Sequence, residues 1–170
     1  MPAPPLVGAS GPVLLVGRRG SRYRCRMNEP TAGPFRRSTS LDRLNELSRG
    51  TAMEPLGIRF TEIGPDYLRG TMPVDERTKQ PYGLLHGGAS VLLAETLGST
   101  AGNLCVPEGR VCVGLEINAN HLRSLREGLL TAVGTPIHLG KTSQVWGVEV
   151  TDQDGRLICI SRCTLAVVEI

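Results

Sequence analysis

Apolar residues along the chain gather in segments that turn residues separate, and the character of each segment outlines the fold. In the C-terminal half, four segments rich in Val, Ile, Leu and Thr predict strands, and glycine-containing turns separate them. Two shorter segments upstream, joined by a Gly-Pro-Asp turn at residues 64–66, predict a hairpin. The six expected strands cover residues 56–64, 67–75, 110–122, 128–140, 142–152 and 156–169.

Residues 87–104 differ from the segments around them. Their sequence, GGASVLLAETLGSTAGNL, is apolar or small nearly all round and is long enough for about five helical turns. Such a helix must be enclosed on most sides. With about six antiparallel strands available, a sheet wrapped around the helix buries it best, which predicts the α+β hot-dog fold. A short helix is also expected at residues 41–49, with Ser40 as its N-cap and Gly50 as its end.

Charge is distributed unevenly along the chain. The net charge is +3, but residues 1–40 hold seven arginines and one acid, a local charge of +6 that leaves −3 on the remainder. A nucleic-acid-binding protein usually carries its basic stripe on the folded body, so we expect no nucleic-acid partner. Six of the 12 prolines lie within residues 1–34. We therefore expect residues 1–38 to be a disordered basic extension, with a transit peptide or a start at Met27 as alternatives, and residues 39–170 to form one domain.

The cysteines indicate a reducing compartment. They are five in number and form no C-x-x-C pair, which argues against a disulfide framework and against a zinc site. No segment approaches the ~18 apolar residues that cross a membrane. We therefore expect a cytoplasmic protein with neither a metal ion nor a membrane partner. The five residues are Cys25, Cys105, Cys112, Cys159 and Cys163.

Glu95 is the single charged residue of the apolar helix at residues 87–104. An ionised carboxylate is costly to bury unless it is paired or used in chemistry, so Glu95 is a candidate catalytic group. The alternatives are an ion pair with a distant arginine and a side chain turned to solvent. Ser99, four residues later, lies on the same helix face, where its hydroxyl can orient the carboxylate or hold a water molecule. Taken alone, a serine at this position is more often a small residue that fills the helix packing.

The start of the same helix offers hydrogen-bond donors. Gly87 and Gly88 leave backbone N–H groups free at the positive end of the helix dipole, where a developing oxyanion is stabilised. A glycine pair can also serve only a tight turn. Gln80 can donate its side-chain amide to the same carbonyl, and His86 can fix the loop by hydrogen bonding.

Spacing along the helix predicts how these groups meet. Gly87 and Glu95 are eight residues apart, about 12 Å along a helix, so one carbonyl group cannot touch both on the same chain. Two subunits with antiparallel helices would bring Glu95 of one to Gly87 and Gln80 of the other. We therefore expect at least a homodimer with two equivalent sites.

The stretch TKQPYGLLHGGASVLLAETLGSTAG, followed by GLEINANHLRSLREG and PIHLGKTSQVW, closely resembles hot-dog 1,4-dihydroxy-2-naphthoyl-CoA hydrolases of menaquinone and phylloquinone synthesis. It is also similar to their relatives, the 4-hydroxybenzoyl-CoA thioesterases and the proofreading thioesterase of enterobactin synthesis. The similarity extends from about residue 41 to residue 168. The extra N-terminal segment is the one evident departure.

The resemblance implies a role for each candidate. Glu95 would act as nucleophile or general base, while Gly87 N–H and Gln80 would polarise the thioester carbonyl. His86 would support the loop, and Ser99 would assist Glu95 or its water. No cofactor is expected, because coenzyme A is part of the substrate, and dimers are expected to pair into a homotetramer.

Contacts with coenzyme A are implied at three places. On the resemblance, Arg123 and Lys141 are suited to bind the phosphates of coenzyme A. Without it, His121 and His138 would be read as structural residues and Arg123 as a solvated charge. The lone Trp146 is expected in the core. The implied contacts are Gly114, then His121, Leu122, Arg123 and Ser124, and then the turn of His138, Leu139, Gly140, Lys141, Thr142 and Ser143.

The leading hypothesis is therefore hydrolysis of an aromatic acyl-CoA, with 1,4-dihydroxy-2-naphthoyl-CoA as the expected substrate. A proofreading thioesterase that acts on a carrier protein and a broad-range acyl-CoA thioesterase are alternatives. A non-catalytic acyl-CoA-binding protein is disfavoured because a binder needs no carboxylate at the carbonyl. A dehydratase is disfavoured because that chemistry pairs a histidine with a differently placed acid.

Overall fold

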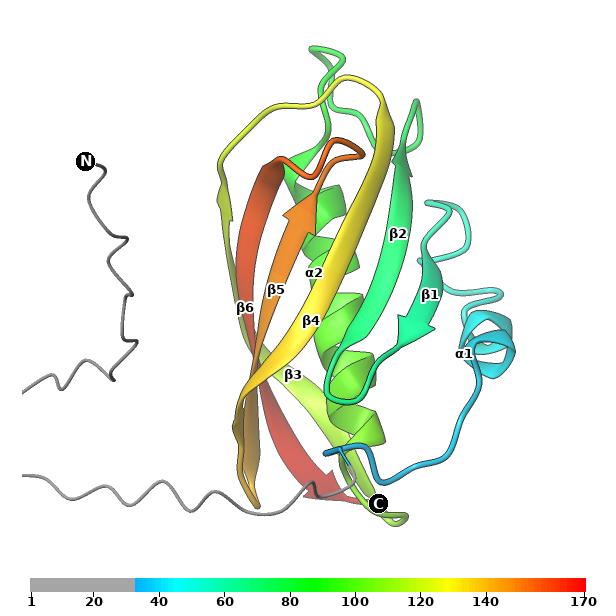
Figure 1. Cartoon of the computed structure of the whole chain (residues 1–170), viewed down its shortest axis with the longest axis vertical. Helices are drawn as coiled ribbons and strands as arrows, with labels where there is room; N and C mark the ends of the chain where they lie inside the picture. The colour runs from blue at the N-terminus through cyan, green and yellow to red at the C-terminus, as the bar shows by residue number, and fades with distance from the viewer. Residues whose placement is uncertain (1–32) are drawn as a thin grey trace, which may run out of the picture. The chain divides into compact units, whose positions relative to one another are not determined.

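The computed structural model describes residues 33–170, so most of the expected basic extension lies outside the described residues. Figure 1 shows one curved sheet wrapped around the long helix, with the short helix beside the first strand. This is the predicted hot-dog architecture. The elements are α1 (Leu41–Leu47), β1 (Arg59–Ile63), β2 (Leu68–Val74), α2 (Gly87–Leu104), β3 (Arg110–His121), β4 (Gly128–Leu139), β5 (Ser143–Thr151) and β6 (Leu157–Glu169).

The sheet is antiparallel throughout, with the strand order β1-β2-β4-β5-β6-β3. Hairpins join β1 to β2, β4 to β5 and β5 to β6, whereas α2 separates β2 from β3 in the chain. The chain therefore leaves β2, crosses the concave face of the sheet as α2, and returns as β3 at the far edge. As a result, β1 and β3 are the two edge strands.

One face of α2 packs closely on the sheet. Leu93, Ala94 and Leu97 are completely buried there, and glycines replace larger residues where the helix comes nearest the strands. A methyl group on Gly98 would lie 3.1 Å from Cβ of Cys163, and one on Gly102 would lie 2.4 Å from a methyl carbon of Leu165. The small residues of α2 therefore set the distance between helix and sheet.

The opposite face of α2 is only partly covered. Leu92, Thr96 and Ser99 are half-buried and Glu95 is exposed. The expectation that this helix is enclosed on most sides is therefore wrong for the single chain. A curved sheet covers one side of a helix, and α1 packs against β1 rather than against α2.

The folded body begins upstream of residue 39. Phe35 packs against the core, and the backbone N–H groups of Arg36 and Arg37 both donate to the Leu104 carbonyl at the end of α2. The Arg37 guanidinium also donates to the carbonyl of Val106 at 3.0 Å. These contacts extend the folded body a few residues before the boundary drawn from the sequence.

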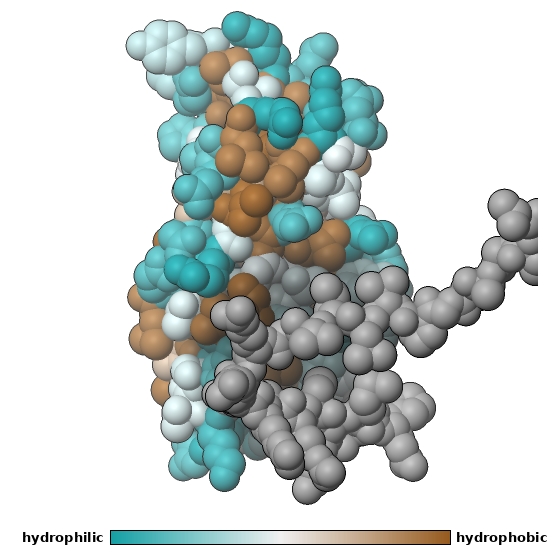
Figure 2. Space-filling view, turned by 60° about the vertical axis from the view of Figure 1, so that its left-hand side comes forward, coloured by the Kyte–Doolittle hydropathy of each residue, from teal (hydrophilic) through white to brown (hydrophobic). Residues whose placement is uncertain are grey.

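The edge strand β3 exposes apolar side chains. Val113 is 46% exposed and Leu115 is 65% exposed. Figure 2 shows hydrophobic residues gathered on the face that comes forward from the left of Figure 1, with hydrophilic residues around them. An edge strand of this length leaves backbone N–H and C=O groups without sheet partners. Within residues 33–170, no helix has the length and apolar character needed to cross a membrane.

Candidate active site

Glu95 and Ser99 share one hollow on the open face of α2. Its volume is about 380 Å³, within the range of small-molecule sites. The predicted helical spacing thus brings these two side chains together. The other lining residues are Thr51, Ala52 and Met53 from the segment before β1, and Leu92, Thr96 and Thr100 from α2.

The Glu95 carboxylate lies beside the edge strand. A methyl group on Gly114 of β3 would come within 3.0 Å of a Glu95 carboxylate oxygen, so glycine is what permits this approach. Among the described residues, no arginine or lysine forms an ion pair with Glu95. The alternative of an Arg-paired glutamate is therefore not seen. The expected burial of Glu95 is not seen either, because the side chain is exposed in the single chain.

The start of α2 presents one backbone donor to a second hollow. His86 is the N-cap, and its ring nitrogen Nδ1 accepts the Gly88 N–H at 2.9 Å. The N–H groups of Ala89 and Ser90 donate to the His86 carbonyl. Among the described residues, the Gly87 N–H has no hydrogen-bond acceptor, and Gly87 lines a hollow of about 350 Å³. His86 thus orders the helix start and leaves one donor for a ligand.

Gln80 lines the same hollow as Gly87. Its side-chain oxygen accepts the Tyr82 N–H at 2.5 Å, so the amide atom in that contact must be oxygen. The amide NH₂ group is left without an acceptor in the described part of the chain. A turn in which Gly83 N–H donates to the Gln80 carbonyl holds this loop. Gln80 and Gly87 therefore offer two donors to one space.

His121 and the residues after it complete the Gly87 hollow. The His121 ring lies over Gly87, where a methyl group would come within 2.8 Å of Nε2, and its Nδ1 lies 3.4 Å from the hydroxyl of Ser90. Arg123, which also lines this hollow, donates to the Leu157 carbonyl at 2.6 Å. Sequence reasoning missed several lining residues of the hollow. The full lining is Gln80, Leu84, Leu85, Gly87, Ser90, His121, Leu122, Arg123, Ser124 and Ile158.

The expected coenzyme A residues separate into distant groups within one chain. His121 to Ser124 lie at the N-terminal end of α2, whereas the turn from His138 to Ser143 lies at its C-terminal end. There Leu139, Gly140 and Lys141 border a hollow of about 600 Å³ that also includes Cys105. Because α2 has 18 residues, its ends are about 27 Å apart.

Burial and charge act on a thiol behind the Glu95 hollow. Burial raises the pKa of Cys163 to about 11, and the negative charge of Glu95 adds to this increase, while a hydrogen bond from Ser99 acts in the opposite direction. Cys163 is completely buried. It therefore stays a neutral thiol at physiological pH and offers no nucleophile next to Glu95.

Residues 82–159 match the family model of the thioesterase superfamily. The chain is 55% identical over 133 residues to the 1,4-dihydroxy-2-naphthoyl-CoA hydrolase of Escherichia coli, covering 78% of this chain and 98% of that protein. The chain belongs to the thioesterase superfamily. It is also 50% identical to the proofreading thioesterase EntH of Cronobacter turicensis, covering 78% and 97% of the two chains.

The thioesterase fold agrees with solved structures. A thioesterase from Haemophilus influenzae superposes with a TM-score of 0.78 at 50% identity, covering 79% of this chain and 94% of that one. A thioesterase variant from Pseudomonas aeruginosa gives a TM-score of 0.80 at 50% identity, covering 81% and 100%. Thioester hydrolysis is therefore the activity of this chain.

Proposed function

We propose that this thioesterase hydrolyses a hydroxylated aromatic acyl-CoA, and that 1,4-dihydroxy-2-naphthoyl-CoA of menaquinone or phylloquinone synthesis is its substrate. The lining of the Glu95 hollow supports this proposal. Ala52, Met53 and Leu92 offer apolar surface to a ring. Thr96, Ser99 and Thr100 offer hydroxyl groups to meet those of the substrate. The Thr51 hydroxyl is already held by the Ser48 carbonyl and the Met53 N–H.

We propose that the site forms between two copies of the chain. The two hollows lie on one helix about 12 Å apart, too far for one carbonyl to reach both. Glu95 lies beside Gly114 and Gly87 lies beside His121, and both Gly114 and His121 belong to the edge strand β3. Antiparallel pairing of β3 with β3, with Gly114 opposite His121, would place each Glu95 beside the partner's helix start.

The same pairing would cover the exposed side of Glu95 and the apolar surface of β3. It also brings the coenzyme A residues at opposite ends of α2 toward one ligand. Further pairing of dimers into a homotetramer is the assembly that we propose. A cytoplasmic location is proposed because acyl-CoA esters occur there, and the cysteines within residues 33–170 are free thiols.

In this arrangement each group has a defined task. Gly87 N–H and the Gln80 amide would donate to the thioester oxygen and stabilise the negative charge that develops on it. Glu95 of the other chain would attack the carbonyl carbon or deprotonate a water that attacks it. Ser99 would hold that water or orient the carboxylate. Collapse of the tetrahedral intermediate expels the coenzyme A thiolate. If water attacked, the free acid is released directly; if Glu95 attacked, a mixed anhydride remains on Glu95 and a water molecule then hydrolyses it to the free acid.

The Gly87 donor carries the proposal. It is the one N–H of the first helical turn without an acceptor in the described chain, and Gly87 lines the same hollow as Gln80. Gly87→Pro removes this N–H at the helix position where proline is tolerated. The preceding His86, at φ −72° and ψ 128°, has the conformation that proline requires of its neighbour. Gly87→Ala is the matched control, since it adds a Cβ at the same place and keeps the donor.

Release of free thiol tests both parts of the proposal. We expect Glu95→Gln and Gly87→Pro each to lose about 10²–10³-fold in kcat with the fold intact, and Gly87→Ala to lose far less. We expect kcat/KM to be highest for 1,4-dihydroxy-2-naphthoyl-CoA and lower for 2-naphthoyl-CoA and alkyl-CoA esters. Full activity of Glu95→Gln would exclude the catalytic assignment, and a preference for alkyl esters would exclude the substrate.

A carrier-protein substrate is the second candidate, because EntH of Cronobacter turicensis is named as a proofreading thioesterase and is about as similar to this chain. A dihydroxybenzoyl group offered both on coenzyme A and on an aryl carrier protein separates the two. A higher kcat/KM on the carrier would favour proofreading. A broad-range thioesterase would show little difference among acyl groups, and tight binding without turnover would indicate a non-catalytic binder.

A further inference from the structure

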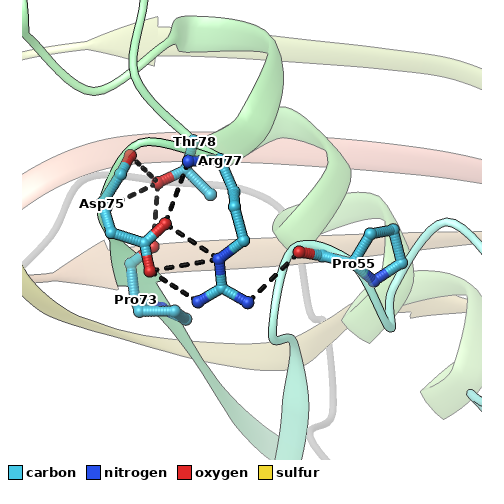
Figure 3. Close-up of polar contacts among 5 residues, drawn as sticks. All are labelled: Pro55, Pro73, Asp75, Arg77 and Thr78. Atoms are coloured by element: carbon cyan, nitrogen blue, oxygen red, sulfur yellow. Dashed lines mark hydrogen bonds and ion pairs between the residues drawn. The ribbon is translucent and has the colours of Figure 1, made fainter.

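Arg77 connects two segments of the chain that line different hollows. Its Nε and Nη2 atoms bind the carboxylate of Asp75, with Nε at 3.0 Å and 3.2 Å from the two oxygens. Its Nη1 atom donates to the carbonyl of Pro55 at 3.2 Å. Figure 3 shows the guanidinium between these two partners. One planar side chain thus joins the loop after β2 to the segment before β1.

On one side, Arg77 stabilises the loop that leads to Gln80 and α2. The Asp75 N–H donates to the hydroxyl of Thr78 at 3.1 Å, and that hydroxyl donates to the Pro73 carbonyl at 2.9 Å. Thr78 is only 1% exposed, and its carbonyl accepts the N–H of His86 at 2.8 Å. A continuous series of hydrogen bonds therefore runs from Arg77 to the residue that caps α2.

On the other side, Arg77 holds the segment that contributes Thr51, Ala52 and Met53 to the Glu95 hollow. Gly57 has a φ of +69°, and a methyl group there would lie 3.1 Å from the Pro73 ring and 3.3 Å from Nη1 of Arg77. The Met53 carbonyl accepts the Ile58 N–H at 3.0 Å, just before β1. The segment is thus a tight series of turns held against Arg77.

We propose that Arg77 is a positioning residue for thioester hydrolysis. It holds two parts of the chain in one fixed arrangement: the loop after β2 that carries Gln80 (the Gln80 loop), and residues 51–53, which line the Glu95 hollow (the Met53 wall). It touches neither hollow and acts through the residues that line them. The planar fork of arginine binds a carboxylate with two nitrogens while a third reaches a carbonyl, which a lysine ammonium cannot do. The inference rests on the proposed role of Gln80 and on the position of the Met53 wall beside Glu95.

Two substitutions and a matched control test the proposal. Arg77→Met removes the connection, whereas Arg77→Lys keeps a charge near Asp75 without the fork. Arg69→Met is the control, because Arg69 forms a comparably exposed ion pair with Glu62 on the β1–β2 hairpin. We expect both Arg77 variants to lose about 10-fold or more in kcat, because small misplacements of reacting groups are costly. We expect Arg69→Met to keep its rate, and melting temperatures will show that all three variants fold.

A double-mutant cycle with Gln80→Ala separates positioning from a general loss of structure. If Arg77 acts through Gln80, Arg77→Met should cost less than about twofold in kcat once Gln80 is gone. Losses that multiply, or an Arg77→Met enzyme with wild-type kcat, would overturn the inference. If Gln80→Ala alone keeps its rate, the role proposed for Gln80 fails. Arg77 is then judged by the Met53 wall, where Arg77→Met should raise KM for aryl-CoA more than for a short-chain acyl-CoA, and equal KM changes would refute it.

Discussion

Two inactive variants of this enzyme should restore activity to each other when they share a dimer. Glu95→Gln removes the carboxylate and Gly87→Pro removes the helix-start donor, about 12 Å away on the same helix. If each site takes Glu95 from one chain and Gly87 from the other, a mixed dimer has one site with both substitutions and one with neither. Its activity should be about half that of the wild type, from two parents reduced by about 10²–10³-fold.

The assay is thiol release by heterodimers purified through two different affinity tags after co-expression. An untagged mixture formed by random exchange should reach about one quarter of wild-type activity, because half of the dimers are mixed and each has one intact site. Glu95→Gln mixed with Glu95→Gln is the control and should stay inactive. A heterodimer no more active than its parents would refute the two-chain site, since a site within one chain is damaged in every subunit.

Three further predictions concern stability and the thiols. Gly102→Ala should lower the free energy of unfolding by about 1–3 kcal/mol in urea titrations, because the added methyl group would meet Leu165 at 2.4 Å. This loss should outweigh the better helix propensity of alanine. A more stable variant would contradict the close packing. Burial raises the pKa values of Cys105 and Cys163 to about 11. Both thiols should therefore resist alkylation by iodoacetamide at pH 8 in the native protein and react once urea unfolds it. Rapid alkylation of the native protein would contradict this. Burial alone would raise the pKa of Asp152, but its hydrogen bonds and its ion pair with Arg156 lower the pKa below its usual value. The ionised carboxylate therefore stabilises the fold at pH values above that usual pKa, and this stabilisation is lost as the pH falls and the carboxylate is protonated. Asp152→Asn should therefore flatten the acid side of the stability–pH curve, and an unchanged curve would count against it.

Local patterns predicted most of the fold. The run of small and apolar residues predicted both ends of α2 to the residue. Segments rich in apolar and β-branched residues, separated by glycine-containing turns, predicted all six strands. The predicted ends of elements are wrong where a single side chain or turn determines where a helix or strand stops. The predicted helix to residue 49 ends at Leu47, because the Ser48 hydroxyl bonds back to the Leu44 carbonyl. The predicted strand from residue 56 begins at Arg59, because tight turns continue through Gly57.

The candidate site was predictable where its residues are close in sequence. Helical spacing brought Ser99 to Glu95, and the loop before α2 brought Gln80 to Gly87. By contrast, residues 51–53 and Ile158 reach the two hollows through tertiary packing, and neither carries a chemical signal in the sequence. Ser90 and Leu92 were missed although the sequence carried a signal, since each lies one helical turn from a candidate residue, Gly87 or Glu95.

The composition of α2 reflects two different demands on one helix. On the side that faces the sheet, glycine and alanine bring the backbone close to β5 and β6, and the side chains of Leu93 and Leu97 are completely buried. On the other side, hydroxyl groups and one carboxylate border a hollow beside the edge strand β3. This surface is poorly suited to pack on the chain's own sheet, because its hydroxyl groups and carboxylate would lose their hydration there. Since an edge strand with exposed apolar residues lies next to it, the second copy that we propose would cover both the strand and this side of the helix. Assembly and catalysis would then depend on the same contact.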